Sequence, residues 1–312
     1  MKIGIIGYKG HASRHIRILK NVSNAELIIY HPKKDLDQIT NCFKDLICSD
    51  CVIISSPTPT HFSYIKNLID NNYRGKVYLE KPGFASIKES YDLEDLQYSS
   101  KLDITIGYHF PFEDKIKFLK SYISQSELGE IISFDIVMSK GIAYKKDFNK
   151  DWRSKDKRAV CHTGLSHALS IFYFLCSENL KKDIDCMVFY NKENGFYDNA
   201  LALSNLEKPF FKAIFSWGAP FVGTKIEIIT TNSLILLQGN LLEIRSPRDT
   251  FDSENRFKTP EIYLTKTFIS KGIKPSILDF INKVKSSTKF NSLSFKQSLK
   301  IGRECLKAKI IE

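Results

Sequence analysis

Short apolar runs alternate with longer mixed segments over the first hundred or so residues, and this rhythm restricts the fold more than any other feature. Repeated strand, helix and strand units of this kind build a parallel sheet covered by helices. Apolar residues recur at helical spacing in 15–21 and 61–71, so both segments are predicted to be helices packed on the sheet. The predicted strands are residues 3–6, 25–30, 51–55, 77–79 and 104–106.

The pattern changes after Pro111, where a helix at 114–124 and an alternating strand at 131–139 are predicted. Several later β-rich segments are separated by turn residues, which is typical of an antiparallel sheet. Two helices close the chain, and the second has Ser294 as N-cap and Gln297 in capping-box spacing. The later strands are predicted at 185–190, 200–206, 211–217, 224–230 and 233–238, and the closing helices at 275–285 and 294–309.

A glycine-containing turn follows the first strand, with the sequence Gly-Tyr-Lys-Gly-His-Ala at 7–12. In the dinucleotide-binding pattern G-x-G-x-x-G/A, Gly7 and Ala12 fill the first and third positions. Lys9 stands at the second, where a missing side chain normally lets the backbone approach phosphate. If the turn binds phosphate, either Gly10 restores that approach or Lys9 itself contacts the phosphate. The alternative is a plain tight turn between strand and helix that binds no cofactor. The context predicts a Rossmann domain with a pyrophosphate at the helix N-terminus.

The end of the second predicted strand carries His31, Lys33 and Lys34. In a dinucleotide-binding fold this end reaches the adenosine ribose, where an acidic residue would bind both hydroxyls of NAD. Cations there suit a 2′-phosphate, so NADP(H) is favoured over NAD(H). A solvated basic turn is the other interpretation.

The net charge of this 312-residue chain is +11, from 46 basic and 35 acidic residues, which suggests an anionic partner. Residues 1–110 contribute +2 and residues 111–312 contribute +9. Residues 145–158 alone hold seven basic and three acidic side chains, a field that suits a phosphate-bearing substrate, although a solvated lysine-rich surface would look the same. Dispersed basic residues without a recognition motif argue against nucleic acid.

Seven cysteines form an odd set, which predicts reduced thiols in the cytoplasm rather than a disulfide framework. No metal site is predicted. The apolar segments are too short and too often interrupted by charges to span a membrane, and the N-terminus enters a strand pattern without a signal peptide.

Further segments, in a specific order along the chain, resemble the Gfo/Idh/MocA oxidoreductases, the glucose-fructose oxidoreductase and inositol dehydrogenase superfamily. The resemblance implies an α/β chain with a Rossmann domain of doubly wound parallel sheet at 1–110. It implies a substrate-binding α+β domain at 111–312 whose open, largely antiparallel sheet joins copies into a homodimer or homotetramer. The segments are residues 54–61 (Ile-Ser-Ser-Pro-Thr-Pro-Thr-His), 80–82 (Glu-Lys-Pro), 107–109 (Gly-Tyr-His), 128–131 (Leu-Gly-Glu-Ile) and 152–167.

The resemblance also implies catalytic roles. Lys81 would handle the proton of the reacting hydroxyl or carbonyl, oriented by Glu80. His167 would be a second donor or base, since imidazole exchanges protons near neutral pH. Thr163 stands where the family usually has Asp, and His162 either takes over part of that catalytic work or is a satisfied polar residue at a helix start.

Binding roles follow from the same resemblance. Arg153 would hold a hydroxyl or an anion, or else form a local salt bridge. Pro111 lies near a position where many relatives carry Arg. The predicted cofactor contacts are Gly7, Tyr8, Lys9, Gly10, Ala12, His15, His31, Lys33, Lys34, Ser55, Pro57, Thr58, His61, Glu80, Lys81 and His109. The predicted substrate contacts are His109, Trp152, Arg153 and His167.

These expectations describe an NAD(P)-dependent dehydrogenase or reductase that moves hydride between nicotinamide and a hydroxyl or carbonyl carbon of a sugar or nucleotide sugar. The substrate is expected to be an anionic sugar derivative. Two alternatives stay open: an imine or C=C reductase of the same family, and a catalytically silent cofactor-binding regulator.

Overall fold

The chain forms two compact units, one of residues 1–112 and 271–303 and the other of residues 113–270 and 304–312. The predicted division at residue 110 lies close to the first boundary, but residues 271–303 belong to the first unit rather than the second. They return because Ile277 and Phe280 are buried in one core cluster with Ile3 and Ile5. The structure, a computed structural model, describes residues 1–22, 24–33, 39–100, 102–124, 128–176, 183–204, 208–219, 223–246, 251–269, 271–286 and 292–312.

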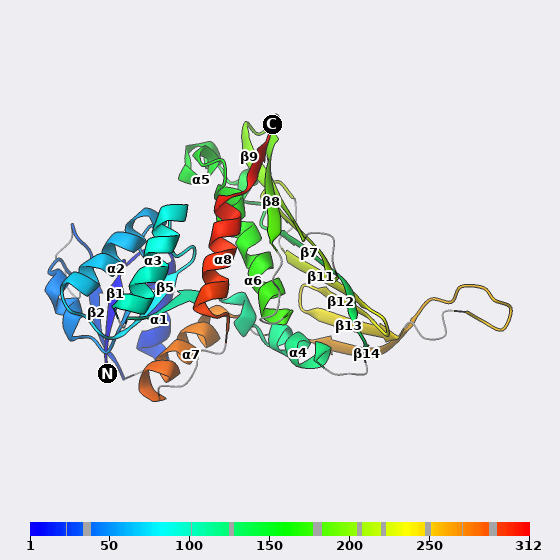
Figure 1. The fold of residues 1–312 in the computed structure, drawn as a ribbon, viewed down its shortest axis with the longest axis horizontal. Helices are drawn as coiled ribbons and strands as arrows, with labels where there is room; N and C mark the ends of the chain where they lie inside the picture. The colour runs from blue at the N-terminus through cyan, green and yellow to red at the C-terminus, as the bar shows by residue number, and fades with distance from the viewer. Residues whose placement is uncertain are drawn as a thin grey trace. The chain divides into compact units, whose positions relative to one another are not determined.

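The first unit contains a six-stranded parallel sheet in the order β3-β2-β1-β4-β5-β6 (Figure 1). The order reverses between β1 and β4, which makes the sheet doubly wound and confirms the predicted fold class. All residues of β4 and the last four residues of β1 and β5 are buried, as expected of strands covered on both faces. The strands are β1 Lys2–Ile6, β2 Glu26–Tyr30, β3 Ile39–Thr40, β4 Cys51–Ile54, β5 Lys76–Glu80 and β6 Asp103–Gly107.

Helices α1 His11–Val22, α2 His61–Asp70, α3 Ile87–Ser99 and α7 Ile273–Ser286 belong to the same unit. Helix α3 is absent from the sequence prediction because its apolar residues give little helical periodicity. Its start has the Ser-x-x-Glu sequence of a capping box instead: the Ser86 hydroxyl accepts from the Glu89 backbone N–H at 3.2 Å, and Glu89 Oε2 accepts from the N–H of Ala85, one residue before the N-cap, at 2.7 Å.

Helix α8 Phe295–Leu306 begins with the capping box predicted from sequence. The Gln297 backbone N–H donates to Ser294 Oγ at 3.2 Å, and the Ser294 N–H donates to Gln297 Oε1 at 2.9 Å. The predicted end at residue 309 is wrong: the helix stops at Leu306, and β15 Lys309–Ile311 pairs in parallel with β8 Ile184–Asn191.

The second unit contains a nine-stranded sheet in the order β14-β13-β12-β11-β7-β10-β9-β8-β15. Two of its pairings are parallel, β10 with β7 and β15 with β8, and the others are antiparallel, which confirms the predicted largely antiparallel sheet. Its remaining strands are β7 Ile131–Ser139, β9 Phe196–Ser204, β10 Phe210–Ser216, β11 Gly223–Thr230, β12 Leu234–Gln238, β13 Leu241–Ser246 and β14 Glu261–Thr267.

One face of this sheet is covered by helices and the other is open. Burial alternates strictly along β10, where Phe211, Ala213 and Phe215 are buried and Phe210, Lys212 and Ile214 are exposed. Helices α4 Asp114–Ile123 and α6 Ser166–Leu175 lie on the covered face, and α6 contacts β7 and β10 (Figure 1). Among the described residues, no helix is both long enough and apolar enough to cross a membrane.

Between β7 and α6 the chain forms only short helical turns, namely η5 Ile142–Tyr144, η6 Phe148–Lys150, α5 Trp152–Lys155 and η7 Cys161–Leu165. The Phe148 ring anchors this segment, with its centroid 5.1 Å from that of Phe196 and 5.4 Å from that of Trp217. η7 is a π-helical turn, a geometry that recurs at functional sites.

Candidate active site

Gly7 sits where β1 turns into α1, and the turn requires glycine. Its φ is +108°, and a Cβ added there would lie 2.8 Å from the carbonyl oxygen of Ser55. Its N–H donates to the Tyr30 carbonyl at 3.0 Å, while the Ser55 N–H donates to the Ile6 carbonyl at 2.9 Å. The turn is therefore locked between the ends of β2 and β4, and no other side chain fits without moving the backbone.

The rest of the turn has the features of a phosphate cradle. Gly10 has a φ of +60° with open space around its Cα, and α1 begins at the next residue. Ala12 is fully buried, as expected at the position where helix and sheet pack closely. The Ser55 hydroxyl is buried and has no hydrogen-bond partner among the described residues. Exposed helix N–H groups and an unsatisfied hydroxyl fit a dinucleotide pyrophosphate.

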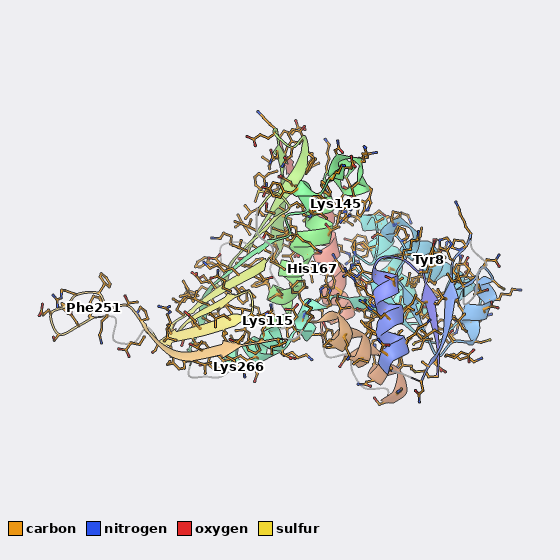
Figure 2. All side chains as sticks on the ribbon, turned by 180° about the vertical axis from the view of Figure 1, so that it is seen from behind. Tyr8, Lys115, Lys145, His167, Phe251 and Lys266 are labelled. Atoms are coloured by element: carbon orange, nitrogen blue, oxygen red, sulfur yellow. The ribbon has the colours of Figure 1, made fainter. Side chains whose placement is uncertain are left out.

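Tyr8 and His31 meet edge to face at the ends of β1 and β2, with ring centroids 5.0 Å apart; Figure 2 labels Tyr8. The Lys33 N–H donates to His31 Nδ1 at 3.2 Å, and the ammonium of Lys9 lies 5.5 Å from the Tyr8 ring centre. Lys34 lies outside the described residues. The structure thus brings Tyr8, Lys9, His31 and Lys33 together at the predicted ribose end.

A polar cluster lies at the end of β5. Glu80 Oε1 accepts a hydrogen bond from His15 Nε2 at 2.6 Å, and His11 Nδ1 lies 3.9 Å from the same oxygen. Burial of Glu80 raises its carboxyl pKa, but the hydrogen bond from His15 and the charges of His15, His11 and His109 outweigh burial and lower it to about 2. Glu80 is therefore a buried carboxylate that stays ionised at neutral pH.

Lys81 follows Glu80 directly and His109 follows β6, so both leave the sheet at the same edge as the glycine turn. Lys81 and Glu80 act oppositely on His11, whose pKa is lowered by burial, raised by Glu80 and lowered again by Lys81. His61 is buried, with Nδ1 3.1 Å from the Pro82 carbonyl and Nε2 2.9 Å from the Ser56 carbonyl. His61 thus ties the start of α2 to the loop after Lys81.

In the second unit, His162 and His167 are both buried, one in the η7 turn and the other at the start of α6; Figure 2 labels His167. The turn packs tightly, since a Cβ on Gly164 would fall 2.1 Å from the ring of Phe215. The Thr163 hydroxyl donates to the Ala159 carbonyl at 2.7 Å. That bond fixes Thr163 to its own helix, where a hydroxyl offers no group that titrates near neutral pH.

Trp152 and Arg153 form the first turn of α5. Trp152 is 58% exposed, and the Arg153 guanidinium binds the Asp151 carboxylate with Nε and Nη2 at 2.9 and 2.7 Å. The hydrogen bond from Arg153 lowers the pKa of Asp151. Asp151 also caps the turn through the Arg153 N–H. The local salt bridge anticipated as the alternative for Arg153 is thus present.

The basic segment around this turn is only partly neutralised. Lys150 pairs with Asp147 at 3.0 Å and Lys157 with Glu312 at 3.9 Å. Lys145, Lys146 and Lys155 are exposed, and no carboxylate of the described chain forms an ion pair with them. These three ammonium groups are therefore not neutralised by a carboxylate of the described chain.

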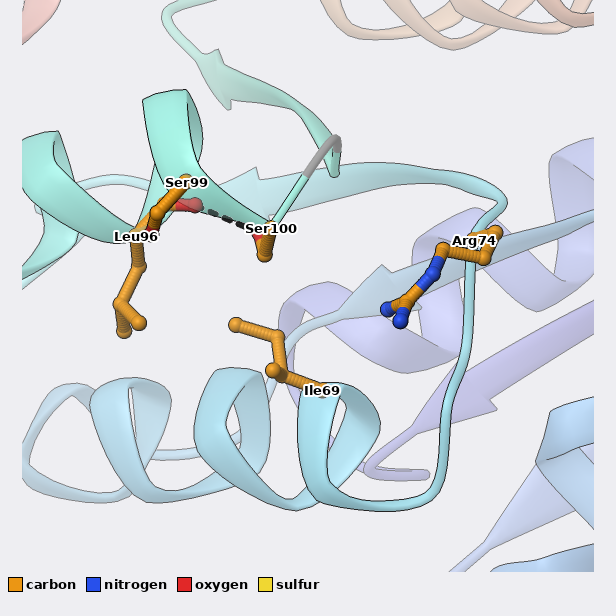
Figure 3. Close-up of a pocket in the computed structure, with 5 residues that line it drawn as sticks. All are labelled: Ile69, Arg74, Leu96, Ser99 and Ser100. Carbon is orange, nitrogen blue, oxygen red and sulfur yellow. Dashed lines mark hydrogen bonds between the residues drawn. The ribbon is translucent and has the colours of Figure 1, made fainter.

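One open surface cavity of about 400 Å³ lies elsewhere in the first unit, between the ends of α2 and α3 (Figure 3). Arg74 and Ser100 line it and precede β5 and β6. It therefore lies at the amino end of these strands, whereas open α/β sheets bind ligands at the carboxyl end. This cavity is not the dinucleotide site.

The predicted residues fall into two sets, one in each unit. The first gathers at the carboxyl edge of the parallel sheet, and the second surrounds η7 and α5. His11, which no sequence argument selected, belongs to the first set; its spacing of four residues from His15 on α1 was the available signal. Cys48 and Cys51 have C-x-x-C spacing, but Cys51 is buried in β4 and burial raises its thiol pKa to about 12.

Comparison with known proteins agrees with this architecture. No model of a known protein family matches the chain. It is 26% identical over 156 residues to glucose-6-phosphate 3-dehydrogenase of Bacillus subtilis, a match that covers 46% of this chain and 44% of the relative. The aligned region thus spans less than half of that relative's length.

Solved structures match nearly the whole chain. UDP-N-acetylglucosamine 3-dehydrogenase of Acidithiobacillus ferrooxidans covers 99% of this chain and 96% of its own, with a TM-score of 0.76 and 15% identity. A provisionally assigned NADPH-dependent oxidoreductase of Desulfitobacterium hafniense covers 98% of this chain and 94% of its own, with a TM-score of 0.81 and 14% identity. An oxidoreductase of Agrobacterium radiobacter, in complex with NAD+, L-tartaric acid and magnesium, covers 99% of this chain and 95% of its own. Its TM-score is 0.77 and its identity 16%.

The chain therefore shares the fold of these oxidoreductases, a doubly wound sheet with a glycine turn followed by a large open sheet. This shared fold and the partial sequence match to a sugar-phosphate dehydrogenase agree with the resemblance inferred from the motifs.

Proposed function

We propose that this protein is an NAD(P)-dependent dehydrogenase that oxidises a secondary hydroxyl of a sugar carrying a phosphate or nucleotide group. One observation carries the proposal: β1, β2, β4, β5 and β6 all end at one edge of the sheet, and each is followed at once by candidate site residues. The carboxyl edge of a doubly wound sheet is where such folds bind dinucleotides. The residues concerned are Gly7, His31, Ser55, Lys81 and His109.

The cofactor would be held by the turn from Gly7 to Ala12 and by the loop from Ser55 to Thr58. When bound, a nicotinamide dinucleotide supplies a hydride acceptor. NADP is the preferred form in this proposal, because His31 and Lys33 offer donors and positive charge at the end of β2 where a 2′-phosphate would lie. The proposal leaves His61 a positioning role, since carbonyl oxygens lie close to both of its ring nitrogens.

Proton transfer falls to Lys81 and His167 in this scheme. As hydride leaves the carbinol carbon, the hydroxyl proton must go to a base, and an amine or an imidazole can accept it. The Glu80 carboxylate next to Lys81 stabilises the ammonium that forms. His162 lies in the turn just before the helix that carries His167, while Thr163 keeps the π-helical turn in place through its bond to Ala159.

The substrate class is supported by charge and by two relatives. The bacterial relatives named above are 3-dehydrogenases of glucose 6-phosphate and of UDP-N-acetylglucosamine, so both substrates carry phosphate. In this chain the exposed ammonium groups of Lys145, Lys146 and Lys155 would attract such an anion. Arg153 remains a hydroxyl or phosphate contact only if the ligand displaces or shares its bond with Asp151.

We place the enzyme in the cytoplasm as a homodimer or homotetramer. All seven cysteines are free thiols, which suits a reducing compartment. The open face of the nine-stranded sheet exposes apolar side chains on several strands, and a second copy would cover them. Those exposed residues include Leu203, Phe210, Ile214, Ile229 and Leu241.

The cofactor proposal is tested by titrating NADPH and NADH and following fluorescence. We expect NADPH to bind at least tenfold more tightly, and an exchange of His31 and Lys33 for Ala to remove that preference without weakening NADH. Equal or tighter binding of NADH by the unaltered protein contradicts the assignment of NADP.

The reaction is tested with glucose 6-phosphate, UDP-N-acetylglucosamine and unphosphorylated glucose as substrates. Lys81→Ala and His167→Ala are each expected to lower kcat by about 10²- to 10⁴-fold, the usual range for a lost acid or base, while dinucleotide affinity changes little. Reduction of imines or activated alkenes instead of sugar oxidation would favour the reductase alternative. Tight dinucleotide binding with no turnover of any substrate would favour a regulator.

A further inference from the structure

We propose that His11, His15 and Glu80 form a binding site for a divalent cation of the zinc class. The two histidines are four residues apart on α1, which places them on one face of the helix. The carboxylate comes from the end of β5. One donor atom from each residue lies within 4.8 Å of the other two, so three ligands of the types that Zn²⁺ prefers converge on one point.

The donor separations are close to those around a small tetrahedral ion, which would replace the proton between His15 and Glu80. Zinc bonds to nitrogen and oxygen ligands measure about 2.0–2.2 Å, so two such ligands lie roughly 3.4 Å apart around the ion. Here the distance from Glu80 Oε1 is 2.6 Å to His15 Nε2 and 3.9 Å to His11 Nδ1, values on either side of that spacing. His11 has a 46% exposed side chain and can rotate toward the ion, while His15 and Glu80 need to move apart by less than about 1 Å.

The charges around the cluster select the kind of ion. Glu80 supplies one negative charge, and Lys81, Arg14 and His109 are cationic or titratable neighbours that oppose a bound cation. Only an ion that gains much from imidazole nitrogen overcomes this repulsion. Zn²⁺ does so, whereas Mg²⁺ and Ca²⁺ prefer sets of oxygen ligands. Three protein ligands leave the fourth position open for water or an anionic oxygen.

The site was not visible in the sequence because its parts are far apart. His15 and Glu80 are separated by 65 positions, and only the parallel pairing of β1, β4 and β5 brings them together. The only local sequence signal for the site is the four-residue spacing of His11 and His15, which is also common on an ordinary helix surface.

The experiment uses the full chain, freed of metal with a chelator, and isothermal titration with ZnCl₂ in the absence of dinucleotide. We expect saturation at one Zn²⁺ per chain. Replacing His11 by Ala leaves the buried pair intact, so the variant folds, and it should bind Zn²⁺ at least tenfold more weakly. His31→Ala is the matched control, because it removes another histidine at the same sheet edge outside the cluster, and its Zn²⁺ affinity should not change.

Two further measurements separate a real site from surface binding. Substitution with Co²⁺ should give the intense visible absorption of a four-coordinate ion, and Glu80→Gln, with its fold checked by circular dichroism, should lose that absorption. Absence of saturable Zn²⁺ binding, or unchanged affinity in His11→Ala, overturns the proposal. Neither result touches the proposed oxidoreductase function, because NADPH binding and sugar oxidation are measured separately.

Discussion

The two sheets of this protein bury their apolar side chains differently, one on both faces and the other on one face. The parallel sheet of the first unit is covered on both faces, so only its edges are free, and its candidate site residues gather at the carboxyl edge. The nine-stranded sheet is covered on one face by α6 and keeps the other open, with its candidate site on the covered side around η7. A doubly covered sheet can recognise ligands only at its edge, whereas a half-covered sheet has a whole face available for another chain.

The sharpest test of this contrast is a methyl group added to the crowded edge of the first unit. Gly7→Ala must accommodate a φ of +108° and a backbone oxygen 2.8 Å from the new Cβ. We expect a loss of about 3 kcal/mol of unfolding free energy, since strained non-glycine conformations cost of order 1–3 kcal/mol before any clash. Urea unfolding measures the change, and NADPH titration should show that binding is lost.

Its control lies in a turn of the open sheet. Gly239 also has a positive φ, +60°, but nothing lies within 4 Å of an added Cβ. Gly239→Ala should therefore cost only the conformational strain, about 1 kcal/mol. If the two substitutions destabilise the protein equally, close approach at the β1 turn is not what requires Gly7.

The open face is tested by placing a charge in its middle. Ile214 is 37% exposed on β10 and pairs with Val137 of β7 and Leu201 of β9. Ile214→Asp should weaken self-association at least tenfold, about 1.4 kcal/mol, because the carboxylate would be buried against the second copy. Analytical ultracentrifugation measures the dissociation constant. Lys88→Asp on α3 of the first unit should leave it unchanged, and a monomeric unaltered protein would refute the proposed interface.

The sequence predicts the fold best where a strand is covered on both faces and is therefore a continuous apolar run. The central strands of the parallel sheet were predicted within a residue or two, because segments such as 51–54 contain only residues that tolerate full burial. The glycine turn and the capping box at Ser294 were equally accessible, since each depends on residues at most five apart. The order of the strands then placed His31, Lys81 and His109 at one edge.

The sequence does not predict features that depend on contacts between distant parts of the chain, or elements in which the spacing of apolar residues is irregular. Helix α3 has few apolar residues, so its capping box at Ser86 was the better signal. Strands β13 and β14 have exposed residues such as Leu241 and Ile262, which blur the alternation. The return of α7 to the first unit depends on Phe280 packing against Tyr78, a contact that no local pattern reveals.

A smaller effect is expected from the ion pair beside the second candidate site. Asp151→Asn keeps a good N-cap but removes the charge that binds Arg153, so we expect a loss of about 1 kcal/mol. The pKa of Asp151 is lowered by folding, so its contribution is complete above the unfolded value of 3.8 and disappears as the pH falls below it. Urea unfolding at pH 7 and pH 3 measures both effects. A difference between the two proteins that persists undiminished at pH 3 would argue against a role for the carboxylate charge.

The smallest effect concerns α8, whose residues 295–303 belong to the first unit and 304–306 to the second. Ser294→Ala removes the acceptor of the Gln297 N–H, and an N-cap is worth about 1 kcal/mol or slightly less when partly replaced by water. Ser294→Asp restores an acceptor and should recover the stability, which thermal unfolding can follow. Because α8 is one continuous helix, hydrogen exchange should show faster opening in Ser294→Ala on both sides of residue 303. Faster exchange confined to residues 295–303 would contradict this expectation and limit the effect of the N-cap to the start of the helix.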